Sequence, residues 1–375
     1  MIKTLYSICI ICLSWLFTSS DKALANTKLL IPYNTESNII NFPITGERTL
    51  RFKRLLIDKD KTIKRHRHLQ SINLKLITSS REHTPNFWLD EELLETRKSC
   101  LRAPTSSCVI EQAHTEAKAT TDIWRRDFSL IFVTEAQAQF GDITAATETT
   151  EIIANTSLRL PALLKLSKAH ATACNFQEAN KIINEVTSNI ETIGIPYIQT
   201  WVFALTASAL TAVKDFKNAK MNIHKALKTV SGIKESNTRA EMYALIASAQ
   251  ADAEDLNGAN NNIRRALIEA DKTNDPYLSA LALAFIASTQ AKIGQNVDYK
   301  RSISATLTKA LTLKTRPRTL VLAFVASIQA EIGDMGAAKE TIDSAIAAVI
   351  MIRDAHSLAP TLAFIGKTLA QIDAP

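Results

Sequence analysis

Glycine and aromatic residues are both scarce in this chain. Its 375 residues include 9 glycines, and 6% of them are aromatic. Alanine, isoleucine and leucine supply most of the apolar content, which suits close helix packing better than a β-sandwich. The hydrophobic share of 46% is ample for a folded core, which argues against a disordered protein. The composition therefore favours an all-α fold.

Recognisable catalytic motifs are also missing. The 7 histidines are scattered and none belongs to an HExxH pattern. The sequence has no glycine-rich phosphate loop and no GxSxG nucleophile elbow. We therefore predict a protein that is not an enzyme and that uses no cofactor or metal.

A long apolar run occurs at the N-terminus. Lys3 precedes an apolar stretch from residue 5 to 17, and Ala23-Leu24-Ala25 offers a small-x-small cleavage site. This arrangement is typical of a secretory signal peptide. The stretch is shorter than the roughly 20 residues that a helix needs to cross a bilayer, so an uncleaved anchor is the less favoured alternative. We predict a signal peptide over residues 1–25 and an exported protein, periplasmic or secreted, with no transmembrane segment after cleavage.

Export would permit a disulfide bond. Cys100 and Cys108 flank a loop-like stretch whose proline and serine residues favour a closed turn. An oxidising compartment allows a bridge between them, and we predict that bridge. Two free thiols are the alternative, while a zinc site is disfavoured because no further ligands follow at zinc spacing.

Basic residues concentrate in residues 26–118, a region in which no repeat is visible and whose fold the sequence leaves open. The densest cluster spans residues 59–68. We predict that it faces an anionic envelope surface or an acidic partner. A solvated face or linker is the alternative, and export makes nucleic acid an unlikely partner. The candidate contacts to an anionic surface are Lys61, Lys64, Arg65 and Arg67.

A short motif recurs about every 40 residues in the rest of the chain, and a fixed period of that length indicates stacked helical hairpins. Each copy places a polar pair between two apolar-periodic segments, as in the turn of a hairpin. We predict six hairpins within residues 119–375, followed by a capping helix over residues 357–372. The six pairs are Gly141-Asp142, Cys174-Asn175, Lys214-Asp215, Glu254-Asp255, Gly294-Gln295 and Gly333-Asp334.

The motif also resembles a known family. The segments IASAQADAED and VASIQAEIGD are similar to the tetratricopeptide repeat, in a bacterial variant with IAxAQAxxGD-type units. The period near 40 residues is longer than the usual ~34, which longer helices would explain. The resemblance covers about two thirds of the chain, from Ala119 onward. It implies a right-handed α-α superhelix, a solenoid whose first helices line a concave face.

Such a face implies a protein or peptide partner. A column of serines on the first helices gives candidate partner-binding residues, although close packing between these helices would also select small residues. A recurring glutamine column is better explained by hydrogen bonds from repeat to repeat than by peptide binding. We expect an exported scaffold or adaptor; the alternative is an envelope enzyme with its active site in residues 26–118 and the repeats as a substrate platform. The serines are Ser208, Ser248, Ser288 and Ser327.

Overall fold

The computed structural model describes residues 91–352 and 358–373. These residues form α-helices joined by short turns, and no strand occurs among them. The predicted all-α fold is therefore confirmed for the described part of the chain. The predicted signal peptide and the basic cluster of residues 59–68 lie outside the described residues.

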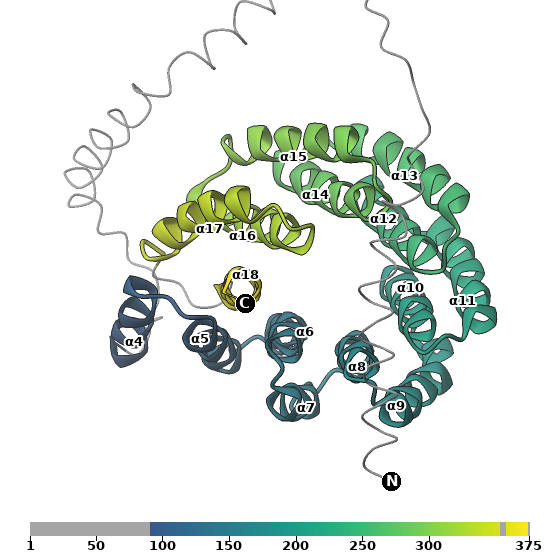
Figure 1. Cartoon of the computed structure of the whole chain (residues 1–375), viewed down its shortest axis with the longest axis horizontal. Coiled ribbons are helices and arrows are strands. Elements are labelled where there is room, and N and C mark those ends of the chain that lie inside the picture. Colours follow the sequence, from purple (N-terminus) through teal and green to yellow (C-terminus); the bar gives the residue numbers. More distant parts are fainter. Residues whose placement is uncertain (1–90, 353–357, 374–375) are drawn as a thin grey trace, which may run out of the picture. The chain divides into compact units, whose positions relative to one another are not determined.

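Six helical hairpins follow one another along an arc, with the first helix of each on the inside and the second on the outside (Figure 1). Each first helix packs against the first helix of the next hairpin. The right-handed superhelix stays a prediction. The hairpins are α6 (Ile123–Phe140) with α7 (Ile143–Glu151), α8 (Thr156–Thr172) with α9 (Phe176–Asn189), α10 (Pro196–Ala212) with α11 (Phe216–Thr229), α12 (Ser236–Asp252) with α13 (Leu256–Asp271), α14 (Pro276–Lys292) with α15 (Asn296–Ala310), and α16 (Thr315–Glu331) with α17 (Met335–Val349).

The polar pairs form the turns of these hairpins. The first residue of every pair has a left-handed backbone, with φ of 94° at Gly141 and 68° at Lys214. The second residue precedes the second helix, and most of these residues cap it with their side chains. Asp142, for example, accepts a hydrogen bond from the N–H of Ala145 at 2.9 Å. A left-handed residue followed by a capping residue ends one helix and starts the next, which explains the pair.

A glycine in place of Lys214 is expected to raise the free energy of unfolding by about 0.5–1 kcal/mol, because a left-handed backbone strains any residue with a Cβ atom. Lys214 is exposed, so the change removes little packing. Urea denaturation measures the effect. Lys220→Gly is the matched control: Lys220 is exposed inside α11, where glycine should instead cost about 0.5–1 kcal/mol. Equal effects of the two substitutions would contradict this account of the turn.

The recurring glutamines connect the two helices of a hairpin. The side-chain oxygen of Gln137 accepts a hydrogen bond from Thr149 at 2.7 Å, and that of Gln250 accepts one from Asn262 at 2.6 Å. Gln290 bonds to the second helix of its own hairpin in the same way. The prediction of bonds from repeat to repeat is therefore wrong at these positions, since the partner lies within the hairpin.

Two helices precede the repeats and belong to the same compact unit, which spans Leu89–Pro375. They are α4 (Glu91–Arg102) and α5 (Ser106–Ala119). Both lie before α6, the first helix of the repeats, and the predicted start of a repeat domain at residue 119 stays a prediction. Neither helix carries the repeat motif, yet α5 packs closely against the C-terminal helix α18 (Leu358–Ile372).

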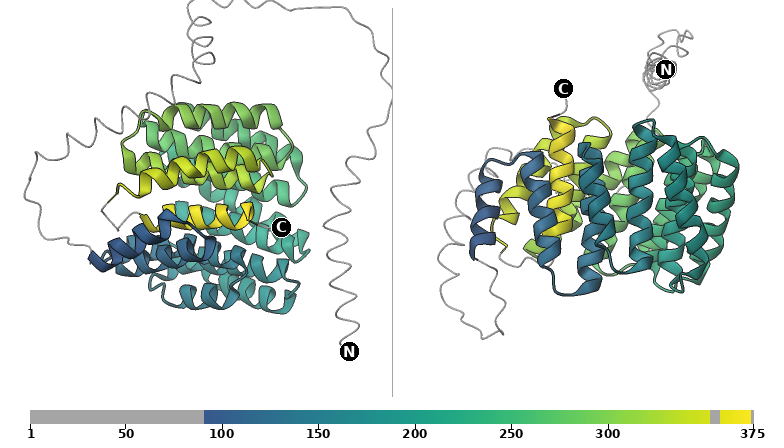
Figure 2. Two further views of the ribbon diagram at one scale, coloured as in Figure 1. Left: turned by 60° about the vertical axis from the view of Figure 1, so that its left-hand side comes forward. Right: turned by 90° about the horizontal axis from the view of Figure 1, so that it is seen from below.

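Helix α18 lies on the inner side of the arc instead of stacking outside the last hairpin (Figures 1 and 2). It packs against α5, α6 and α16, and all its residues from Leu358 to Thr368 are buried. The predicted C-terminal helix thus exists, but its position joins the first and last hairpins.

Candidate functional site on the inner face

Four columns of side chains on the first helices form what we call the inner face. Members of one column stand at the same distance before the turn residue of each hairpin, and the columns follow one another three or four residues apart, on one side of each helix. The first column is Phe128, Pro161, Trp201, Glu241, Leu281 and Leu320; the second is Phe132, Lys165, Leu205, Leu245, Phe285 and Phe324; the third is Glu135, Lys168, Ser208, Ser248, Ser288 and Ser327; the fourth is Gln139, Thr172, Ala212, Asp252, Lys292 and Glu331.

Helix α18 is held on this face by aromatic contacts. Phe364 of α18 lies between Phe132 of α6 and Phe324 of α16, with ring centroids 5.3 and 5.0 Å away. The series continues from Phe324 to Phe285 of α14 at 4.8 Å. Aromatic pairs at such distances contribute about 0.5–1.5 kcal/mol each beyond the area they bury. The inner face therefore uses part of its second column to bind a helix of its own chain.

A buried lysine of α18 completes this attachment. The Nζ atom of Lys367 is 3.2 Å from Glu135 of α6 and 2.5 Å from Glu331 of α16. Lys165 of α8 pairs with Glu135 as well. Burial alone would raise the pKa of Glu135, but the two lysines hold it well below its ordinary value. The first and sixth hairpins are thus joined through one ammonium group.

The serine column lies on the inner face, and most of its members have partners within the protein. Ser208 donates a hydrogen bond to Asp252 of the next first helix at 2.5 Å, and Ser248 is 3.1 Å from the Nζ atom of Lys292. Asp252 and Lys292 also pair with each other at 2.5 Å. These serines and charged side chains connect α10, α12 and α14.

The other two serines differ in exposure. Ser327 is buried and donates to the backbone oxygen of Phe324 at 3.1 Å, so its hydroxyl is bonded within its own helix. Ser288 is half-buried at the corresponding place on α14. The four serines hold corresponding places on four successive first helices, and their role in binding a partner stays a prediction. Three charged residues, Lys168, Asp252 and Lys292, lie beside these serines on the inner face. They could not be predicted from the sequence, because they interrupt the repeated pattern.

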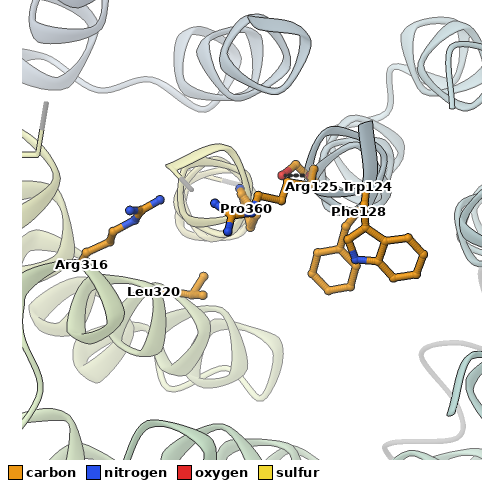
Figure 3. A pocket seen from close by; sticks show the side chains of 7 residues that line it. Trp124, Arg125, Phe128, Arg316, Leu320 and Pro360 are labelled. Atoms are coloured by element: carbon orange, nitrogen blue, oxygen red, sulfur yellow. Dashed lines mark hydrogen bonds between the residues drawn. The ribbon is translucent and has the colours of Figure 1, made fainter. Parts of the chain in front are cut away.

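A cavity of about 500 Å³ opens at the end of the inner face where the first helices begin. Trp124 and Phe128 of α6 form one side of it, and Leu320 of α16 lies opposite (Figure 3). Arg125 and Arg316 extend from the two sides toward α18, whose Pro360 also lines the cavity. Such a volume can hold one or two side chains of a peptide.

Cys100 of α4 and Cys108 of α5 lie at disulfide distance. Their sulfur atoms are 2.01 Å apart and their Cα atoms 5.9 Å apart. The candidate surface residues Lys61, Lys64, Arg65 and Arg67 lie outside the described residues.

No protein-family model matches this sequence, and a search of curated proteins finds no match. Across residues 91–352 and 358–373, no three His, Cys, Asp or Glu side chains gather in a way that could hold a metal ion. None of the helices in that part of the chain is long and apolar enough to cross a membrane.

Proposed function

We propose that this protein is an exported scaffold of the tetratricopeptide-repeat type that binds a peptide or protein segment on its inner face. One observation carries the proposal: the middle hairpins keep large apolar side chains half-exposed on this face. Helix α18 packs mainly on α5, α6, α16 and α17, and so leaves the first helices between them largely uncovered. The half-exposed residues are Trp201, Leu205, Leu245, Leu281 and Phe285.

The way α18 binds supports this assignment. It lies against α6 and α16 through an aromatic residue and a paired lysine, and it occupies the side of the arc on which the first helices lie. An amphipathic segment can bind a groove between helices through the same kinds of contact. The N-terminal sequence pattern supports export, and the Cys100–Cys108 bridge that we propose would suit an oxidising compartment.

Photo-crosslinking tests this function. A benzoylphenylalanine in place of Leu245, in the full-length chain, is expected to capture a partner from envelope extract. The same group in place of Ile268 should not, because Ile268 is 59% exposed on the second helix α13 and does not belong to the inner face.

Adding Leu205→Glu is expected to abolish capture from position 245, since the charge would lie one hairpin away in the same column. Circular dichroism checks that this variant remains folded. Equal capture from positions 245 and 268, or capture that survives Leu205→Glu in the folded variant, would contradict binding on the inner face.

A further inference from the structure

One carboxyl group on the inner face has no partner within the described residues. Glu135 and Glu331 pair with Lys367, and Asp252 pairs with Lys292. Glu241 of α12 is the fourth carboxylate of the face, and it makes no hydrogen bond or ion pair with the described part of the protein. A carboxylate removed from water without a partner costs free energy, so a compensating group from outside would bind favourably.

The neighbouring helices explain why Glu241 is unpaired. Helix α10 contains no charged residue, and Lys292 of α14 lies at the far end of its helix, paired with Asp252. Arg239 of α12 itself is engaged with Glu269 of α13 at 2.6 Å. No basic side chain of these helices is therefore left to pair with Glu241.

Aromatic and apolar residues hold the positions next to Glu241 on the inner face. Trp201 and Leu281 hold the corresponding places on the two adjacent first helices, and Leu245 follows one turn along α12. Tyr277 of α14 is also near: burial first, and then the charge of Glu241, raises the pKa of its phenol. Indole and phenol rings attract cations through their faces, and leucines can cover the aliphatic stem of a long basic side chain.

We infer that Glu241 binds the lysine or arginine side chain of a segment that docks on the inner face, with Trp201 and Tyr277 beside the cationic group. This inference rests on the proposed function and adds to it the chemistry of the ligand. An ammonium or guanidinium group would form charge-assisted hydrogen bonds with the carboxylate. A segment that has a norleucine at that position would leave the carboxylate unpaired.

The binding should depend on pH. Burial raises the pKa of Glu241 to about 7, so its carboxyl group ionises as the pH rises through neutrality. The titratable and charged residues on the packed helices are Tyr197 of α10, Asp275 and Tyr277 at the start of α14, Arg239, Tyr243 and Asp252 of α12, and Arg265 and Glu269 of α13. Of these, Arg239 and Glu269 pair with each other and Arg265 lies over Tyr243. The charge of Arg316 of α16 also reaches Tyr277, and an arginine stays charged at every pH in this range. The group that changes charge between pH 6 and 8 is then Glu241, and a cationic ligand should bind more tightly at pH 8.

Fluorescence anisotropy with defined probes tests the inference on the full-length protein. The probes are labelled twelve-residue peptides of leucine, alanine and glutamine with a central lysine, norleucine or glutamate. At pH 8 the lysine peptide is expected to bind about tenfold more tightly than the norleucine peptide, and the glutamate peptide more weakly than both. The advantage of lysine should shrink at pH 6.

Glu241→Gln is expected to remove the preference for lysine, while Glu254→Gln, at an exposed turn, should keep it. A preference that survives Glu241→Gln would overturn the inference. The inference would also be overturned if the lysine and norleucine peptides bound equally well. If Leu205→Glu abolished that equal binding, the peptides would still be binding on the inner face, and the proposed function would stand. No binding of any peptide would overturn both.

Discussion

Replacing Arg97 by methionine is expected to lower the free energy of unfolding by about 3–5 kcal/mol. Arg97 of α4 is 1% exposed, and its Nη1 atom is 3.2 Å from an oxygen of Glu116 in α5, which is fully buried. Its Nη2 atom donates a hydrogen bond to the backbone oxygen of Ile352 at 2.9 Å. Without the guanidinium group, the buried carboxylate of Glu116 loses its charged partner and keeps the hydrogen bond from Gln112 at 3.1 Å, and the backbone oxygen of Ile352 loses the bond from Nη2. Desolvation makes such losses much larger than those at the surface.

Urea denaturation at pH 7 measures this loss. Lys98→Met is the matched control, because Lys98 belongs to the same helix but its ion pair with Glu95 is exposed and screened by solvent. The double variant Arg97→Met with Glu116→Leu should recover much of the loss, since it removes both buried charges. If Arg97→Met cost no more than Lys98→Met, the buried pair would contribute little to stability.

The hairpins could be predicted because their signals are local. The turn residue and the capping residue are adjacent in sequence, and each pair determines its own helix ends, as at Gly141-Asp142. Lys214 and Glu254 have φ above 60° without being glycine, and only the repeat spacing reveals them as turn residues. The regular period therefore predicts a turn at positions where the identity of the residue alone would not.

The place of α18 could not be predicted in this way. Its contacts join residues far apart in sequence, such as Lys367 with Glu135. A local sequence pattern does not show which distant helices pack against each other. One signal was available: residues 358–368 are apolar on most sides, which is typical of a helix that is buried all round. The same argument applies to α4 and α5, which lack the repeat motif and pack through distant partners.

The repeat spacing indicates which residues share a column of the inner face, but not what those residues bind. The spacing of Ser208 and Ser248 assigns both to one column, but packing between first helices also selects small residues. In the structure these serines bond to Asp252 and Lys292 of the next first helices. Trp201 and Glu241 belong to a column whose residue type changes from one hairpin to the next, so no repeated residue marks their positions. Whether Glu241 has a partner depends on helices about 40 residues away in either direction, which a pattern along one helix does not contain.

Contacts between the ends of this helical unit alter how it should unfold. In an open array of repeats each unit contacts only its neighbours, so unfolding can begin at an end and spread. Here Lys367 bonds to Glu135, and Arg97 bonds to the backbone of Ile352, so both ends are tied to the rest. We therefore expect the native protein to unfold in one cooperative transition.

Replacing Gly366 by leucine is expected to break this closure and to lower the free energy of unfolding by about 3 kcal/mol. A Cβ atom at Gly366 would lie 2.5 Å from the Cγ1 atom of Ile110 and 3.2 Å from its backbone nitrogen. The side chain of Ile110 could rotate away, but the backbone of α5 could not, so a larger residue must push α18 off α5. Gly336→Leu is the matched control: Gly336 is exposed in α17 with no atom within 4 Å of an added Cβ, so leucine there should stabilise the helix by about 0.5–1 kcal/mol.

The shape of the transition separates closure from ordinary overpacking. If α18 joins the two ends, Gly366→Leu should broaden or split the urea transition monitored by circular dichroism, because each end then unfolds without the other. Overpacking without loss of closure would shift the midpoint and leave the slope unchanged. A variant that unfolds like the native protein in both respects would show that the packing of α18 on α5 does not couple the two ends. The contacts of Lys367 with Glu135 and of Arg97 with Ile352 would then have to couple them.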